Sequence, residues 1–142
     1  MNRSFALFVA ALAATAALPA AAAPTPEHAA ACVAALESDA EGMAQQFRQG
    51  KAEVEPELVH RVQQGFAFIG AAYKQGVRDA EATRMLKAAE KAQESLPPAE
   101  LAARQAACKS EGTRLLDNAN VLERAFVEHA ARRRVEKLKR SD

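Results

Sequence analysis

Apolar residues recur along this 142-residue chain at alternating spacings of four and three, which is the period of one face of an α-helix. In the first such stretch the apolar positions are Ala29, Val33, Leu36, Ala40, Met43 and Phe47. In the second stretch they are Val59, Val62, Phe66, Ile69 and Tyr73. A helix with one apolar face must bury that face against another element. The chain is therefore expected to fold as an all-α protein.

Helix start and stop signals divide the first part of this pattern into separate segments. Thr25 and Pro26 form an N-cap followed by proline at the first helical position, and Gly50 and Gly76 are placed to end helices. The proline pair at 97–98 ends a third segment, because proline cannot continue a helix and restricts the residue before it. These signals predict helices over residues 26–49, 56–75 and 79–96.

The fourth segment is much longer than the others. Its stripe continues through Leu101, Gln105, Cys108, Gly112, Leu115, Ala119, Leu122, Phe126 and His129. A single helix over 98–139 would be more than about 60 Å long, at about 1.5 Å per residue. Such a helix would extend well beyond any of its partners.

The N-terminal 22 residues have the features of a cleaved secretory signal peptide. A positive charge near the start precedes an uncharged run over 5–18, and the alanines at 20–22 offer the small-x-small pattern that signal peptidase cleaves. We expect cleavage after Ala22, because cleavage one residue later would leave Pro24 beside the cut. The mature chain, residues 23–142, is expected to be a single soluble helical domain in the bacterial periplasm or secreted medium, exported by the Sec route.

The two cysteines, Cys32 and Cys108, indicate how the helices are arranged. An even number of cysteines in an exported chain favours a disulfide. If four helices alternate in direction, as short loops require, Cys32 lies about 9 Å above the base of the bundle and Cys108 about 12 Å above it. A disulfide between them and an up-down-up-down four-helix bundle therefore support each other.

The same count brings the fourth helix to the base of the bundle near Leu116, which predicts a body over about 26–116 and a helical extension over about 117–140. Two courses are open for the extension. The helix can continue straight and associate with a second copy or another protein. It can instead break at the polar cluster 117–120 and fold back as a fifth helix, since Asn120 and Glu123 resemble a capping box. The uninterrupted spacing favours the straight helix.

Charge and composition argue against catalysis and nucleic-acid binding. The chain has 19 basic and 18 acidic residues, which is not the charge balance of a nucleic-acid-binding protein. It has no glycine-rich phosphate loop, no nucleophile-elbow serine and no convergent pair of carboxylates. Both cysteines are expected in the disulfide, so neither is a free nucleophile. We expect a non-enzymatic protein with no catalytic residues.

Protein–protein contact is the function that these features favour, in the manner of an adaptor, an inhibitor or immunity protein, or a chaperone-like protein. The partner is an unidentified protein or a second copy, with a homodimer formed through the C-terminal helix. The expected interaction residues are Leu115, Leu122, Phe126, Phe68, Arg132, Arg133, Arg134 and Lys137. Phe68 has an alternative interpretation as a core residue of the most enclosed helix. The basic cluster at 132–140 has two alternatives: it stabilises the helix C-terminus, or it binds an anionic membrane surface.

A haem- or metal-binding bundle is an alternative of a different class. Glu57 and His60 have the spacing found in ferritin-like di-iron sites, but the second such motif is missing. The residues available to ligate a haem or a metal are Met43, Met85, His60 and His129. Because the histidines are scattered over different helices, the favoured expectation is no cofactor and no metal.

Overall fold

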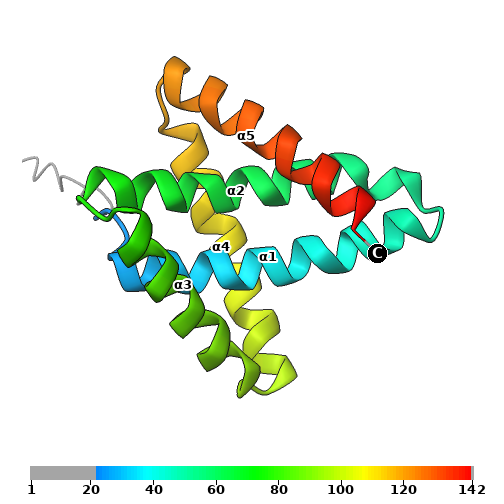
Figure 1. Ribbon diagram of the computed structural model, residues 1–142, viewed down its shortest axis with the longest axis horizontal. Coiled ribbons are helices and arrows are strands. Elements are labelled where there is room, and N and C mark those ends of the chain that lie inside the picture. Colours follow the sequence, from blue (N-terminus) through cyan, green and yellow to red (C-terminus); the bar gives the residue numbers. More distant parts are fainter. Residues whose placement is uncertain (1–21, 142) are drawn as a thin grey trace, which may run out of the picture.

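The computed structural model describes residues 22–141, and this part of the chain is helical apart from its turns and ends. Its elements are α1 (Pro26–Arg48), a short 3-10 helix η1 (Ala52–Val54), α2 (Glu55–Lys74), α3 (Asp79–Glu94), α4 (Pro98–Asp117) and α5 (Val121–Arg140). The all-α fold and the bundle-like packing that the sequence predicts are confirmed (Figure 1). The signal peptide expected over residues 1–22 lies outside the described residues except for its last alanine.

The antiparallel pair α1 and α2 forms the centre of the molecule, and the other three helices lie against it (Figure 1). Helix α3 packs chiefly against α1, whereas α4 packs against both α1 and α2. These two helices run in opposite directions and cross the central pair obliquely. Helix α5 returns along α2 toward the end where α1 stops and α2 begins.

The helix boundaries follow from local backbone chemistry. Thr25 Oγ1 accepts a hydrogen bond from the backbone amide of His28 at 3.2 Å, which caps the start of α1. Gly50 and Gly76 follow α1 and α2 with φ of 96° and 93°, a left-handed conformation that glycine adopts without steric cost. The predicted boundaries of the first three helices are therefore close to the observed ones.

The fourth segment breaks where the polar cluster lies. Helix α4 ends at Asp117, and Asn120 caps α5: its Oδ1 accepts from the amide of Glu123 at 3.0 Å, and the Glu123 carboxylate accepts from the amide of Asn120 at 3.0 Å. The Arg124 side chain donates to the carbonyls of Asp117 and Ala119 at 2.8 and 2.9 Å. The expectation of a straight helix is wrong, and the folded-back fifth helix is the course the chain takes.

Folding back also changes which face of the C-terminal segment is buried. The buried stripe of α5 consists of Val127, Ala131, Val135 and Leu138. The stripe expected from a continuous helix included Leu122, Phe126 and His129, and all three of these side chains are exposed. Apolar residues occupy both faces of this segment, so their spacing alone does not reveal which face meets the body.

Two hydrophobic clusters form the core, one toward each end of the central pair. The first surrounds the disulfide and contains Ala29, Cys32, Ala35, Leu36, Phe68, Ala72, Val77 and Cys108. The second contains Ala40, Ala44, Leu58, Val62, Ala131, Val135 and Leu138. Among these buried residues, α4 contributes only to the first cluster and α5 only to the second.

Two polar side chains of α2, those of Arg61 and Gln64, are buried. Arg61, which is 3% exposed, forms ion pairs with Asp39 (Nε–Oδ2 2.7 Å) and Glu57, and donates Nη1 to Gln64 Oε1 at 2.7 Å. Helix α4 comes so close here that a Cβ at Gly112 would lie 2.8 Å from the Cβ of Gln64. The close approach of α4 therefore requires glycine at position 112. The burial of Arg61 requires its paired carboxylates.

No helix within residues 22–141 combines the length and the apolar character that crossing a bilayer requires.

Candidate functional site

The most exposed large apolar side chains lie together at the start of α5. Val121 and Leu122 are each 82% exposed and Phe126 is 67% exposed. They are three of the four large hydrophobic residues that are exposed in residues 22–141, and the fourth is Tyr73 on α2. Clustered apolar exposure of this kind marks an interaction site more often than scattered exposure does. We call Val121, Leu122 and Phe126 the α5 apolar surface.

This surface is held in a fixed place relative to the body. Besides closing the capping box with Asn120, Glu123 forms an ion pair with Lys74 on α2, with Nζ and Oε1 2.5 Å apart. The hydrogen bond from Lys74, followed by that from the Asn120 amide, lowers the pKa of Glu123 below its ordinary value. The first turn of α5 is thus anchored to α2 through Glu123, which directly follows Leu122.

A groove of about 230 Å³ runs beside the α5 apolar surface. Small residues of α2, including Ala67, Gly70 and Ala71, line one side of it, and Leu115 of α4 and Phe126 of α5 line another. The groove is mainly apolar, with Lys74 and Glu123 among its lining residues. It places small side chains beside protruding large ones on one face of the molecule.

The four apolar residues that were predicted to form an interaction surface do not all lie in one place. Leu115 and Phe126 line this groove, whereas Leu122 does not line it and is exposed on α5 four residues before Phe126. Phe68 does not join them, because it is fully buried in the first core cluster, as its alternative interpretation expected. The proposal that Phe68 belongs to an exposed docking patch is therefore wrong.

Part of the basic cluster at the C-terminus fastens α5 to the body. Lys139 forms ion pairs with Glu55 of α2 at 2.7 Å and Glu136 at 2.9 Å, and its Nζ lies 5.0 Å from the ring centroid of Phe47. The hydrogen bonds from Lys139 to Glu55 and then Glu136 raise the pKa of Lys139 above its ordinary value. Arg48 of α1 donates to the carbonyl of Leu138 at 2.6 Å.

The four predicted basic residues differ in their availability. Arg134 pairs with Glu37 of α1, and Arg132 pairs with Glu128 within α5 at 2.8 Å. Arg133 and Lys137 are exposed and form no ion pair within residues 22–141. The charge available to an anionic surface is therefore smaller than the sequence suggests.

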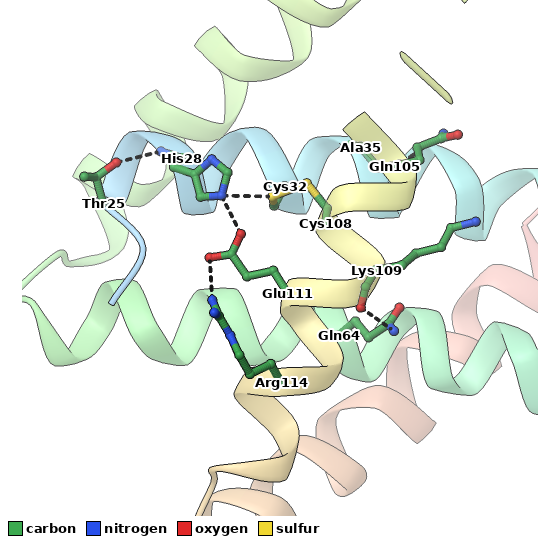
Figure 2. Close-up of a disulfide and its surroundings, with 10 residues drawn as sticks. All are labelled: Thr25, His28, Cys32, Ala35, Gln64, Gln105, Cys108, Lys109, Glu111 and Arg114. Atoms are coloured by element: carbon green, nitrogen blue, oxygen red, sulfur yellow. Dashed lines mark hydrogen bonds and ion pairs between the residues drawn. A yellow bond between two sulfur atoms is a disulfide. The ribbon is translucent and has the colours of Figure 1, made fainter. Parts of the chain in front are cut away.

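The disulfide joins α1 to α4 and has a polar edge (Figure 2). Cys32 and Cys108 are bonded as predicted, with their Cα atoms 5.3 Å apart, and both are buried. His28 points its Nε2 between the Cys32 sulfur, 3.7 Å away, and Glu111 Oε2, 2.7 Å away. Arg114 lies 3.6 Å from the other oxygen of Glu111. Histidine, cysteine, aspartate and glutamate side chains can ligate a metal ion. Within residues 22–141, one group of three or more of them has its potential ligand atoms all within 4.8 Å of one another, and it consists of His28, Cys32 and Glu111.

Sequence reasoning missed the pair of His28 and Glu111, although a signal was available. His28 precedes Cys32 by four residues and Glu111 follows Cys108 by three. Residues at these spacings share one face of a helix. Once the disulfide is assumed, both side chains must lie on the faces that the disulfide brings together.

The residues of the haem or metal alternative are spread over the fold. Met43 packs against the second core cluster and Met85 against the first. His60 on α2 lies 3.2 Å from the side-chain amide of Gln64, and His129 is exposed on α5. The geometry thus favours the disulfide edge over these four residues as a place for metal ligation.

No protein family, no curated protein and no solved structure matches this chain. Its function is accordingly inferred from its own residues.

Proposed function

We propose that this protein is an exported, non-enzymatic interaction protein that docks through the α5 apolar surface and the groove beside it. The observation that carries the proposal is the exposure of Val121, Leu122 and Phe126 on a helix turn that is capped and anchored. Large apolar side chains that protrude from rigid backbone lose little entropy on binding, and they commonly supply much of the binding energy of an interface.

A second copy of the chain is the occupant that this face fits. Phe126 lies at one edge of the groove, and the small residues Gly70 and Ala71 line the opposite part. In a two-fold symmetric dimer, each copy can place its protruding residues against the small residues of the other. An isologous contact of this kind needs only one self-complementary face.

The disulfide is consistent with an oxidising compartment outside the cytoplasm. Together with the signal peptide expected over residues 1–22, it supports a periplasmic location. The non-enzymatic assignment is supported by the bonding of both cysteines to each other, which leaves no free thiol in the described chain. The alternative of membrane binding is left with fewer available charges, chiefly Arg133, Lys137 and Arg140.

The experiment is sedimentation equilibrium of the mature protein and of the double variant Leu122→Ser/Phe126→Ser. We expect a concentration-dependent dimer for the natural protein and a monomer for the variant. The matched control is Ala102→Ser/Ala106→Ser, two exposed positions with the same spacing on α4, and it should dimerise normally. A natural protein that stays monomeric at high concentration, or a variant that dimerises equally well, would contradict the proposal.

A further inference from the structure

The polar edge of the disulfide carries residue types that ligate zinc in proteins, and two of these residues, Cys32 and Cys108, are bonded to each other. Four side chains with zinc-binding atoms meet where α1 crosses α4: His28 and Cys32 from α1, and Cys108 and Glu111 from α4. Nitrogen, thiolate sulfur and carboxylate oxygen are the ligands that Zn²⁺ takes in proteins, with tetrahedral geometry. We propose that reduction of the Cys32–Cys108 disulfide converts this edge into a zinc site formed by these four residues.

Three of the four ligand atoms, those of His28, Cys32 and Glu111, already lie within 4.8 Å of one another. From the usual bond lengths, a nitrogen and a sulfur on one tetrahedral zinc are about 3.6 Å apart, and a nitrogen and an oxygen about 3.3 Å. His28 Nε2 lies 3.7 Å from the Cys32 sulfur and 2.7 Å from Glu111 Oε2. The His28–Glu111 pair and the two sulfurs have to separate, and the released Cys108 thiolate has to move toward His28 and Glu111 to complete the site. The His28 side chain is 49% exposed and that of Glu111 20% exposed, so solvent reaches these two ligands, whereas both cysteines are buried beneath them.

The chemistry balances with a dithiol as the reductant. A dithiol delivers two electrons and two protons to the sulfur–sulfur bond, is itself oxidised to a disulfide, and leaves Cys32 and Cys108 as thiols. When Zn²⁺ binds, both thiols release their protons to solvent. Two thiolates, the Glu111 carboxylate and neutral His28 then give the site a net charge of about −1. Arg114, placed beside Glu111, offsets this charge and orients the carboxylate.

Such a site would keep α1 and α4 joined in both redox states. In the oxidised protein the disulfide makes the joint, with 76 residues of separation between its ends. In the reduced protein zinc would restore the crosslink through the same two sulfurs. This assignment does not depend on the function of the α5 apolar surface, which lies on other residues.

The test uses the mature protein, with and without reduction by a phosphine, titrated with Co²⁺ as a spectroscopic probe and then with Zn²⁺. We expect one equivalent of Co²⁺ per reduced chain, with the ligand-field bands of tetrahedral cobalt and a thiolate charge-transfer band, and its displacement by Zn²⁺. The oxidised protein should show neither band. His28→Ala and Glu111→Gln should weaken Zn²⁺ binding by about a hundredfold, whereas the control His129→Ala should bind as the natural protein does.

Circular dichroism covers the case in which the reduced chain unfolds without metal. Recovery of helical signal by Zn²⁺ in the natural protein, but not in His28→Ala, would support the site. The proposal is overturned if the reduced protein gives no tetrahedral cobalt spectrum and no recovery of helix. It is also overturned if the His28 and Glu111 variants bind Zn²⁺ as tightly as the natural protein.

Discussion

Helices α4 and α5 are equal in length but are attached to the central pair by different means. Helix α4 is bonded covalently to α1 through Cys108, in the first core cluster. Helix α5 has no covalent link beyond the chain itself and is held by an apolar stripe, a capping box at its start and ion pairs near its end. We therefore expect reduction to release α4, whereas acid and loss of the cap should release α5.

The largest expected effect is on the α4 side. Replacing both cysteines, Cys32→Ser/Cys108→Ser, removes a crosslink with a sequence separation of 76 residues. The chain-entropy relation gives a loss of about 4.5 kcal/mol in the free energy of unfolding. Urea denaturation followed by circular dichroism measures this loss. A loss below about 1 kcal/mol would show that packing alone holds α4 in place.

A truncation in the second cluster tests the attachment of α5. Leu138→Ala removes a side chain that is 5% exposed and packed between α5 and the central pair. We expect a loss of about 3 kcal/mol and faster hydrogen exchange in α5, with α4 unchanged. Exchange mass spectrometry checks the second part. Equal acceleration in both helices would mean that they open as one unit and are not attached independently.

The capping box should contribute less than the apolar stripe. Asn120→Ala removes the acceptor for the amide of Glu123 and should destabilise the protein by about 1 kcal/mol. Thermal denaturation by circular dichroism measures the change. Ser95→Ala, an exposed position after α3, serves as a control for a polar side chain lost at another helix end. An effect of Asn120→Ala no larger than that of this control would contradict the role given to the cap.

The smallest effect concerns pH. The pKa of Glu123 is lowered in the folded protein, so its stabilising contribution is present above its ordinary value of 4.5 and is lost as the pH falls through the folded pKa. Acid should therefore weaken the start of α5. We expect the melting temperature of Glu123→Gln to fall less between pH 7 and pH 3 than that of the natural protein. An equal fall in melting temperature between pH 7 and pH 3 for the two proteins would show that the Glu123 carboxylate does not make this contribution.

Much of the fold could be predicted from the sequence because it depends on local signals. Thr25, the two turn glycines and the prolines fixed the helix ends, and the two cysteines fixed one crossing. The course of α5 was harder to predict, because Leu122 and Phe126 continue the earlier spacing while Val127 and Ala131 form the face that is buried. Packing against α1 and α2 distinguishes the two faces.

The polar contacts depend on how helices cross in space. Arg61 lies off the predicted apolar stripe of α2, yet it is buried, and Asp39 of α1 supplies a counter-charge. His28 and Glu111 meet only because the disulfide fixes the crossing of α1 and α4. Spacing along one helix indicates which residues share a face, but it does not indicate which face of another helix they meet.

Site-specific photo-crosslinking in cells that produce this protein tests whether the α5 apolar surface docks against a second copy. A photoreactive phenylalanine analogue would replace Phe126 in one variant and Ala102 on α4 in another, both exposed positions. We expect an adduct at position 126 with the mass of two copies of the chain, and no such adduct at position 102. Adducts that are absent at both positions, or equally strong at both, would contradict the assignment of the α5 apolar surface as the docking surface.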